Sequence, residues 1–165
     1  MAGSQSRPAD IFLPVWTNGR GAPLDVMVVC PLQKKLVARA VVNPGHTLTY
    51  VQERRNQKHG AECQGAGIDF IPIVVEALGG WDTVSADCIR RIARAQGARL
   101  GLPSHEAVPR LFQRLSVTLW RANAPMWGRR MGVLPPEIDG VECGDLSWPL
   151  HYRCSLALVL GLLAY

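Results

Sequence analysis

The sequence predicts an α/β domain in which a small mixed β-sheet is flanked by helices. Two short stretches rich in branched apolar residues, joined by a Gly- and Asn-containing segment, predict a hairpin near the N-terminus. A third, more apolar stretch follows a charged helical segment, and two amphipathic segments follow it. Of 165 residues, 48% are hydrophobic and 19% are charged, which is typical of a globular chain and excludes a disordered one.

The hairpin is predicted from residues 10–16 (DIFLPVW) and 24–32 (LDVMVVCPL), with TNGRGAP as the turn. Pro14 favours an edge position for the first strand, because proline has no N–H to donate to a neighbouring strand. Asp10 and Asp25 each stand at the predicted entrance of a strand. A simple hairpin would therefore place them at opposite ends, and a long turn or a bend at Pro14 would be needed to bring them together.

A charged segment from Tyr50 to Gly65 predicts the first helix. Arg54 and Lys58 share one of its faces, and Arg55 and Lys58 are near neighbours. The stretch that follows, IDFIPIVVEALGG at 68–80, is almost continuously apolar. That character predicts a central strand covered on both faces.

Two further helices are predicted over residues 81–102 and 104–130. Asp82 or Ser85 is the candidate N-cap of the first, and Ser104 begins the second. Their periodic apolar residues should face the core: Cys88, Ile89, Ile92 and Ala93 in the first, and Leu111, Leu115, Val117 or Thr118, and Leu119 in the second.

The chain divides into three parts by composition. Residues 1–6 have the composition of a disordered end, residues 7–130 form the domain, and residues 131–165 read as a poorly specified tail. The apolar run LALVLGLLAY is about half of what spans a bilayer, so no membrane segment is expected. Five cysteines without a CxxC pair predict reduced thiols in an intracellular protein, with the nucleus as an open alternative, and argue against zinc.

Basic residues outnumber acidic ones, and the formal net charge is +5. Several arginines gather on the predicted helices, at Arg54, Arg55, Arg90, Arg91, Arg94 and Arg99. Such a distribution fits contact with the phosphates of DNA, although a solvated helix face gives the same pattern. DNA is therefore the expected partner, no membrane is expected, and the oligomeric state is left open.

The acids and the basic helix together form a candidate catalytic set. Asp10 and Asp25, if adjacent, can hold Mg²⁺ or Mn²⁺ through oxygen, while Lys58 or Arg55 stabilises charge on a phosphate. The simpler alternative is that both acids are solvated or cap the chain at strand ends. Glu76 could be an outer ligand, and we favour the interpretation that it caps a turn.

The order of these motifs resembles a known nuclease family. RPAD, then LDVMVV, a basic helix and GIDFIPIVVEALGGW are similar to the restriction-endonuclease-like domain of site-specific non-long-terminal-repeat retrotransposons, within the PD-(D/E)xK superfamily. The similarity covers about residues 7–127, and FIPIVVEALGGW is its most distinctive phrase.

The resemblance implies a metal-dependent DNA endonuclease with a restriction-endonuclease-like core. Asp10 matches the acid of the first motif and Asp25 that of the second. The acid-x-Lys pattern would place lysine where Met27 stands, so the resemblance implies a lysine on the following helix, in the region of Arg55 and Lys58. Two alternatives remain open: a detached, catalytically inactive remnant that binds nucleic acid, suggested by Ala9, Met27 and Arg55, and a small scaffold whose C-terminal part binds a protein.

Overall fold

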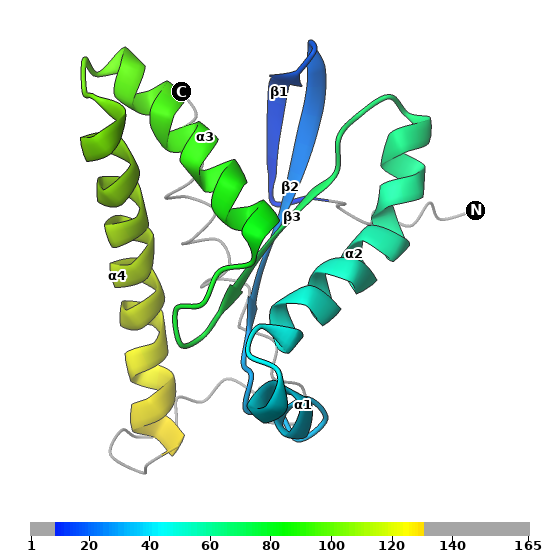
Figure 1. The fold of residues 1–165 in the computed structure, drawn as a ribbon, viewed down its shortest axis with the longest axis vertical. Coiled ribbons are helices and arrows are strands. Elements are labelled where there is room, and N and C mark those ends of the chain that lie inside the picture. Colours follow the sequence, from blue (N-terminus) through cyan, green and yellow to red (C-terminus); the bar gives the residue numbers. More distant parts are fainter. Residues whose placement is uncertain (1–8, 131–165) are drawn as a thin grey trace.

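A computed structural model describes residues 9–130, with side chains described through residue 124. The predicted end at 1–6 and the predicted tail at 131–165 lie outside the described residues. The elements are β1 (Ile11–Thr17), β2 (Arg20–Val29), α1 (Val37–Val42), α2 (His46–Gly65), β3 (Ile71–Glu76), α3 (Thr83–Arg99) and α4 (Ser104–Arg130). The predicted α/β class, a small mixed sheet flanked by helices, is confirmed (Figure 1).

The three described strands form one sheet in the order β1-β2-β3. β1 runs antiparallel to β2, and β2 runs parallel to β3 after a crossover through α1 and α2. Pro14 lies in the edge strand β1, as expected, because an edge strand needs ladder donors on one side only.

The β1–β2 turn is tighter than the sequence suggested. Asn18 and Gly19 both have positive φ values, 52° and 75°, which is typical of the two-residue turns that match the twist of a hairpin. β2 therefore begins at Arg20, and the expected turn residues up to Pro23 belong to the strand. This earlier start decides where Asp25 lies.

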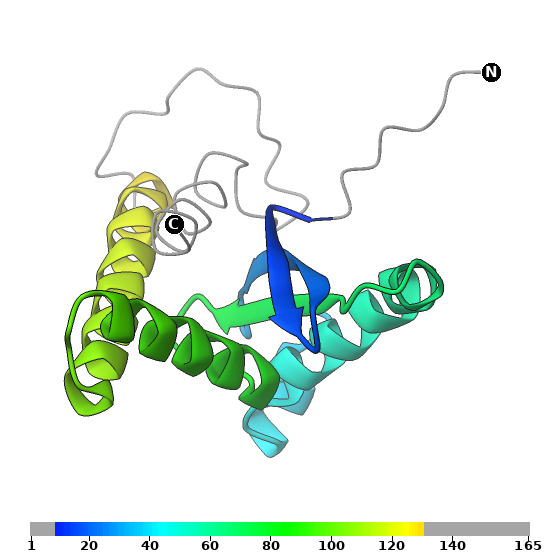
Figure 2. The same cartoon turned by 90° about the horizontal axis from the view of Figure 1, so that it is seen from above.

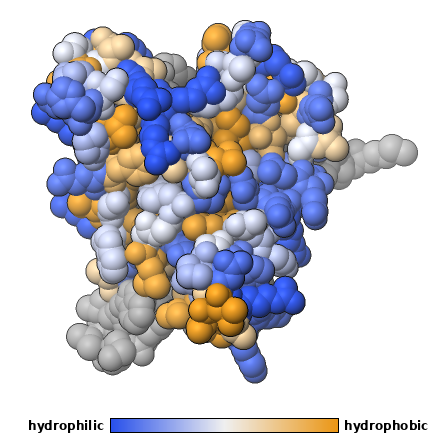
Figure 3. All heavy atoms as spheres, in the orientation of Figure 1, coloured by the Kyte–Doolittle hydropathy of each residue, from blue (hydrophilic) through white to orange (hydrophobic). Residues whose placement is uncertain are grey.

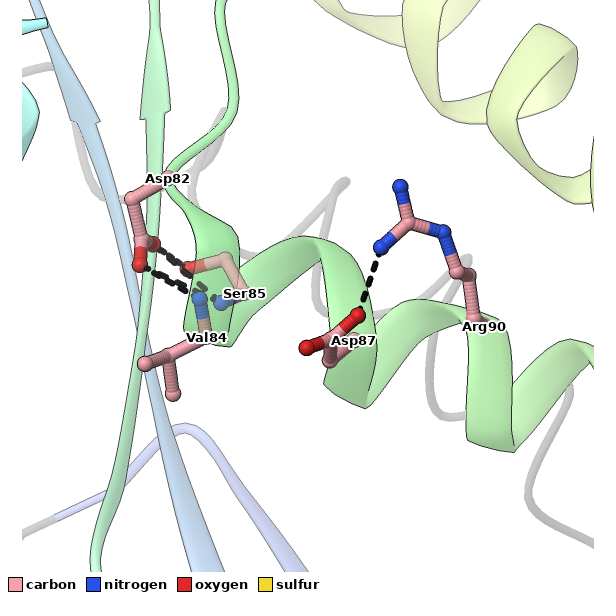
Figure 4. A network of polar contacts seen from close by, with 5 residues as sticks. All are labelled: Asp82, Val84, Ser85, Asp87 and Arg90. Carbon is pink, nitrogen blue, oxygen red and sulfur yellow. Dashed lines mark hydrogen bonds and ion pairs between the residues drawn. The ribbon is translucent and has the colours of Figure 1, made fainter.

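β3 is covered on both faces, but it is not the central strand of the described sheet; β2 is. The first turn of α3 closes the edge of β3 (Figure 4). The Ser85 hydroxyl accepts a hydrogen bond from Val74 N at 2.7 Å and lies 3.3 Å from the Pro72 carbonyl oxygen. Asp82 caps α3 by accepting from Val84 N and Ser85 N, and its carboxylate also contacts the Ser85 hydroxyl.

Helices cover the two faces of the sheet unequally (Figure 2). α3 and α4 lie on one face, over the main core, and α2 lies on the other, over a smaller cluster of Val29, Leu48 and Val74. The expected helix positions Cys88, Ile89, Ile92, Ala93, Leu111, Leu115 and Leu119 are buried, whereas Val117 is exposed. α4 has the predicted bounds, α2 begins four residues earlier than predicted, and α1 was not predicted. No helix among the described residues is long and apolar enough to cross a membrane.

Candidate functional site

Asp10 and Asp25 lie at neighbouring positions of the β1–β2 hairpin. Ile11 is the Cα partner of Leu24, so Asp10, directly before Ile11, and Asp25, directly after Leu24, lie at the same end of the paired segment. The prediction that the acids enter their strands at opposite ends of a hairpin was wrong. It assumed that β2 begins near Leu24, whereas β2 begins at Arg20 and Asp25 lies within the strand.

The Asp10 carboxylate is tied to the backbone of β2. Asp10 Oδ2 accepts a hydrogen bond from Val26 N at 2.8 Å, and Asp10 N donates to the Leu24 carbonyl at 2.9 Å. β1 begins only at Ile11, so the side chain serves a strand donor that β1 itself does not reach. Asp10 as a whole is an exposed residue.

Asp25 is buried on the face of the sheet that α2 covers. Along β2 the residues Ala22, Leu24, Val26 and Val28 join the main core, so Asp25 alternates to the opposite face together with Met27 and Val29. Its exposed fraction is 7%. A carboxylate this deeply buried requires charged or hydrogen-bonding neighbours, because desolvation of an isolated charge is costly.

Arg55 of α2 supplies one such neighbour. Its Nη1 lies 3.4 Å from Asp25 Oδ2, and the side chain is 25% exposed. Arg55 follows Leu48 and Val51 on the sheet-facing side of the helix, at the i, i+3 and i+7 positions of one stripe. The resemblance implied a lysine on this helix, in the region of Arg55 and Lys58, and the residue that contacts Asp25 is the arginine, Arg55.

The other members of the predicted set lie further out. Arg54 and Lys58 are exposed on α2, and Lys58 follows Arg55 by about one helical turn. Met27, at the position where the superfamily pattern has lysine, is half-buried and packs against the cluster under α2. Arg55 thus contacts Asp25, Asp10 bonds to the backbone of the residue after Asp25, and Lys58 is exposed on the same helix as Arg55.

The donor set at this position suits a hard divalent cation. Magnesium commonly binds through one or two carboxylates and completes its shell with water and phosphate oxygens, so Asp10 and Asp25 provide the required chemistry. Among the described residues no group of three or more His, Cys, Asp or Glu side chains converges on a metal position. The Arg55 guanidinium already neutralises Asp25 in part and would compete with a cation for it.

Glu76 lies at the end of β3, four residues after Pro72, which is the register partner of Asp25. Its N–H donates to the Gly80 carbonyl at 2.7 Å, and the Glu76 carbonyl accepts from Gly79 N at 2.8 Å, which closes a turn. Burial raises the pKa of its carboxyl above the usual value of a glutamate. Its place in the turn agrees with the interpretation we favoured, and it is remote from Asp25.

The three candidate DNA-binding arginines of α3 point in two directions. Arg90 forms an ion pair with Asp87 at 2.6 Å and lies 6.0 Å from the centroid of Phe112 on α4 (Figure 4). Arg91 points the other way, over the Trp16 ring of β1, while Arg94 lines the cavity beside it. The sequence pattern gathered all three on the predicted helix and did not single out Trp16.

The remaining candidate groups are explained by packing. Trp81 packs edge-on against Phe112 with ring centroids 5.6 Å apart, as a core residue would, and His59 packs against Phe70. Burial raises the pKa of Cys88 to about 12, so this thiol is unreactive at neutral pH. Cys30 is half-buried and packs against the main core.

The fold and the site together define an α/β domain in which one carboxylate precedes β1, a second lies within β2, and an arginine of α2 contacts the second. Comparison with protein-family models, with curated proteins and with solved structures gave no match.

Proposed function

We propose that the domain is a metal-dependent DNA endonuclease of the restriction-endonuclease-like type. One observation carries the proposal: the hairpin brings Asp10 and Asp25 to the same end of the β1–β2 pair, and Arg55 of α2 contacts Asp25. The strand order adds support, because an antiparallel hairpin continued by a parallel crossover strand is the kind of mixed core that the resemblance implies. The overall positive charge favours a polyanionic substrate.

Each residue has a distinct task in this proposal. Asp10 and Asp25 hold the cation, which when bound supplies Lewis-acid activation of the phosphodiester and of the attacking water. Lys58, exposed on α2 three residues after Arg55, stabilises negative charge on the phosphate oxygens. Arg55 orients the Asp25 carboxylate through their ion pair.

Nicking of supercoiled plasmid tests the proposal. The wild-type protein should nick DNA with Mg²⁺ or Mn²⁺ and lose this activity with a chelator. Asp25→Asn should reduce the rate at least about 100-fold, since even indirect supporters of metal sites cost 10- to 100-fold. Asp10→Asn should do the same while keeping an acceptor for Val26 N.

Asp69→Asn is the matched control. Asp69 also pairs with an arginine, Arg20 at 3.2 Å, but this pair is partly exposed and lies near the turn of the hairpin, away from Asp10 and Asp25. Its variant should cleave at about the wild-type rate. Far-ultraviolet circular dichroism of all three variants checks folding. Absence of cleavage by the wild-type protein with either cation would contradict the proposal.

A second candidate is a DNA-binding domain without catalysis. The Arg55–Asp25 ion pair favours it, because a guanidinium already sits where a cation would approach, and Met27 replaces the lysine of the superfamily pattern. This candidate requires salt-sensitive DNA binding that neither a chelator nor Asp25→Asn alters. The scaffold alternative depends on residues 131–165, which lie outside the described residues.

A further inference from the structure

A cavity of about 440 Å³ lies between β1 and α3, apart from the Asp10–Asp25 position. Leu13 and Ile92, both part of the main core, form its apolar floor together with Ala95. Asp25 faces α2 on the other side of the sheet, so the cavity and the carboxylate pair open on different faces. We call this cavity the β1–α3 groove.

The β1–α3 groove is positively charged. Arg91, Arg94 and Arg99 line it, and none of its lining residues is acidic. Within the described part of the chain, Arg94 and Arg99 form no ion pair, whereas Arg90, on the other side of α3, pairs with Asp87. Figure 3 shows strongly hydrophilic side chains over α3 and apolar side chains toward the β1–β2 hairpin. An anionic group would therefore find cationic donors without displacing an acid.

One wall of the groove is a flat stack of two side chains. The guanidinium carbon of Arg91 lies 3.8 Å from the centroid of the Trp16 ring, close enough for a strong cation–π contact. Arg91 also donates to Thr17 Oγ1 at 3.4 Å. These contacts fix the plane of the guanidinium, which reduces the entropy lost when a ligand stacks on it or bonds to its edge.

The apolar floor and the arginines that line the groove together match the two parts of a nucleotide, its base and its phosphate. A bare phosphate or a double-stranded backbone would use the arginines but leave the apolar floor uncovered. An unpaired base can cover the floor and stack on the Trp16–Arg91 wall, while its phosphates reach Arg94 and Arg99. In a duplex the bases are stacked inside and cannot enter.

We propose that the β1–α3 groove binds single-stranded nucleic acid, one unpaired nucleotide stacking on Trp16 and Arg91 with its phosphates on Arg94 and Arg99. The choice of nucleic acid as the ligand rests on the proposed function. The proposal adds that the bound nucleic acid is single-stranded, which the proposed function does not specify. It also assigns Trp16 and Arg99 to binding.

The test is fluorescence anisotropy of the full chain with a labelled 12-nucleotide thymidine strand and with a hairpin duplex of equal phosphate number. The single strand should bind at least about tenfold more tightly than the duplex, as expected from base stacking. Arg94→Gln/Arg99→Gln should weaken single-strand binding and reduce the slope of log affinity against log salt by about 1.4, from about 0.7 per phosphate contact.

The matched control is Arg114→Gln/Arg121→Gln, which removes the same charge from exposed positions of α4. The logarithm of the affinity and the salt slope of this variant should both stay within about a tenth of a unit of the wild-type values. Trp16→Leu should weaken single-strand binding about tenfold, and Trp16→Phe, which keeps a ring, should recover most of it. Because Trp16 is half-buried, circular dichroism of both variants checks that they fold.

The outcomes separate this proposal from the proposed function. Equal weakening of binding by the α3 and α4 arginine substitutions would overturn the proposal that the groove binds a single strand. So would duplex binding as tight as single-strand binding. Neither result bears on the nicking activity. Displacement of the strand by poly-glutamate at equal charge would identify an acidic protein segment as the better ligand and also overturn it. Absence of plasmid nicking with retained, Trp16-dependent single-strand binding would reject the nuclease alone.

Discussion

Arg55 Nη1 of α2 lies 3.4 Å from Asp25 Oδ2 of β2, so a helix cation contacts a strand carboxylate that is 9% exposed at its side chain. The pair connects the crossover helix to the central strand. It also lowers the negative charge that Asp25 can offer to a metal ion, because two cations cannot share one buried carboxylate without repulsion.

Arg55→Gln should therefore raise the affinity for Mg²⁺. Removing the guanidinium removes the cation that competes for the Asp25 carboxylate, so titration calorimetry should show binding at least about tenfold tighter than in wild type, equivalent to about 1.4 kcal/mol. Arg54→Gln, which removes the same charge from an exposed neighbour, should leave the affinity unchanged. Equal effects of both variants would mean that only net charge matters, and no effect of either would argue against a cation site.

Ser85→Ala should destabilise the domain by about 1–3 kcal/mol, the cost of leaving a buried donor without its partner. The hydroxyl is fully buried and accepts from Val74 N at 2.7 Å. Urea unfolding measures the change. Ser116→Ala, at a half-buried serine of α4, should shift the free energy of unfolding by no more than about 0.5 kcal/mol. A similar loss in both variants would mean that the hydroxyl on the β3 edge has no special role.

Gly97→Ala should destabilise the domain by about 1–3 kcal/mol through overpacking. A Cβ at Gly97 would lie 2.5 Å from the Cβ of Ala107 and 3.1 Å from the Leu102 carbonyl oxygen, where α3 and α4 approach each other. Gly60→Ala on α2 meets nothing within 4 Å and should stabilise by up to about 1 kcal/mol through helix propensity. Thermal unfolding of both variants measures the contrast, and a stabilised Gly97→Ala would contradict the close helix contact.

Glu76→Gln should stabilise the protein more at pH 7 than at pH 4. Burial raises the folded-state pKa of Glu76, so the folded state binds the proton more tightly than the unfolded state. The contribution of this carboxyl to stability is therefore present at low pH and falls as pH rises from about 4.5, the ordinary value. Urea midpoints of the two proteins should diverge over this range. Parallel pH profiles would show that Glu76 is solvated.

Local rules predicted much of the fold. Asp82 could be identified as a helix cap because a carboxylate before a periodic apolar segment satisfies the free N–H groups of the first turn. The bounds of α4 followed from Ser104 and a sustained helical period. These features depend on residues a few positions apart, which the sequence alone brings together.

The site depended on features that local rules do not contain. Arg20 to Pro23 are weak strand formers, and they are extended in the structure because β1 pairs with them. That pairing brings Asp10 and Asp25 to the same end of the hairpin. The spacing of Arg55 from Leu48 and Val51 is consistent with a position on the side of α2 that faces the sheet, but the same spacing on an isolated helix also fits a solvated arginine. Trp16 became significant only once β1 was placed beside α3.

The Ser85 hydroxyl makes the two lateral edges of the sheet chemically unequal. On the β3 side a side chain already occupies the position where another strand would donate and accept, so growth of the sheet in that direction requires α3 to leave. Among the described residues β1 pairs only with β2, and its other edge carries Pro14. Strand addition, whether by a partner or in aggregation, is thereby directed to one side of the domain, where a proline removes one of the donors it would use.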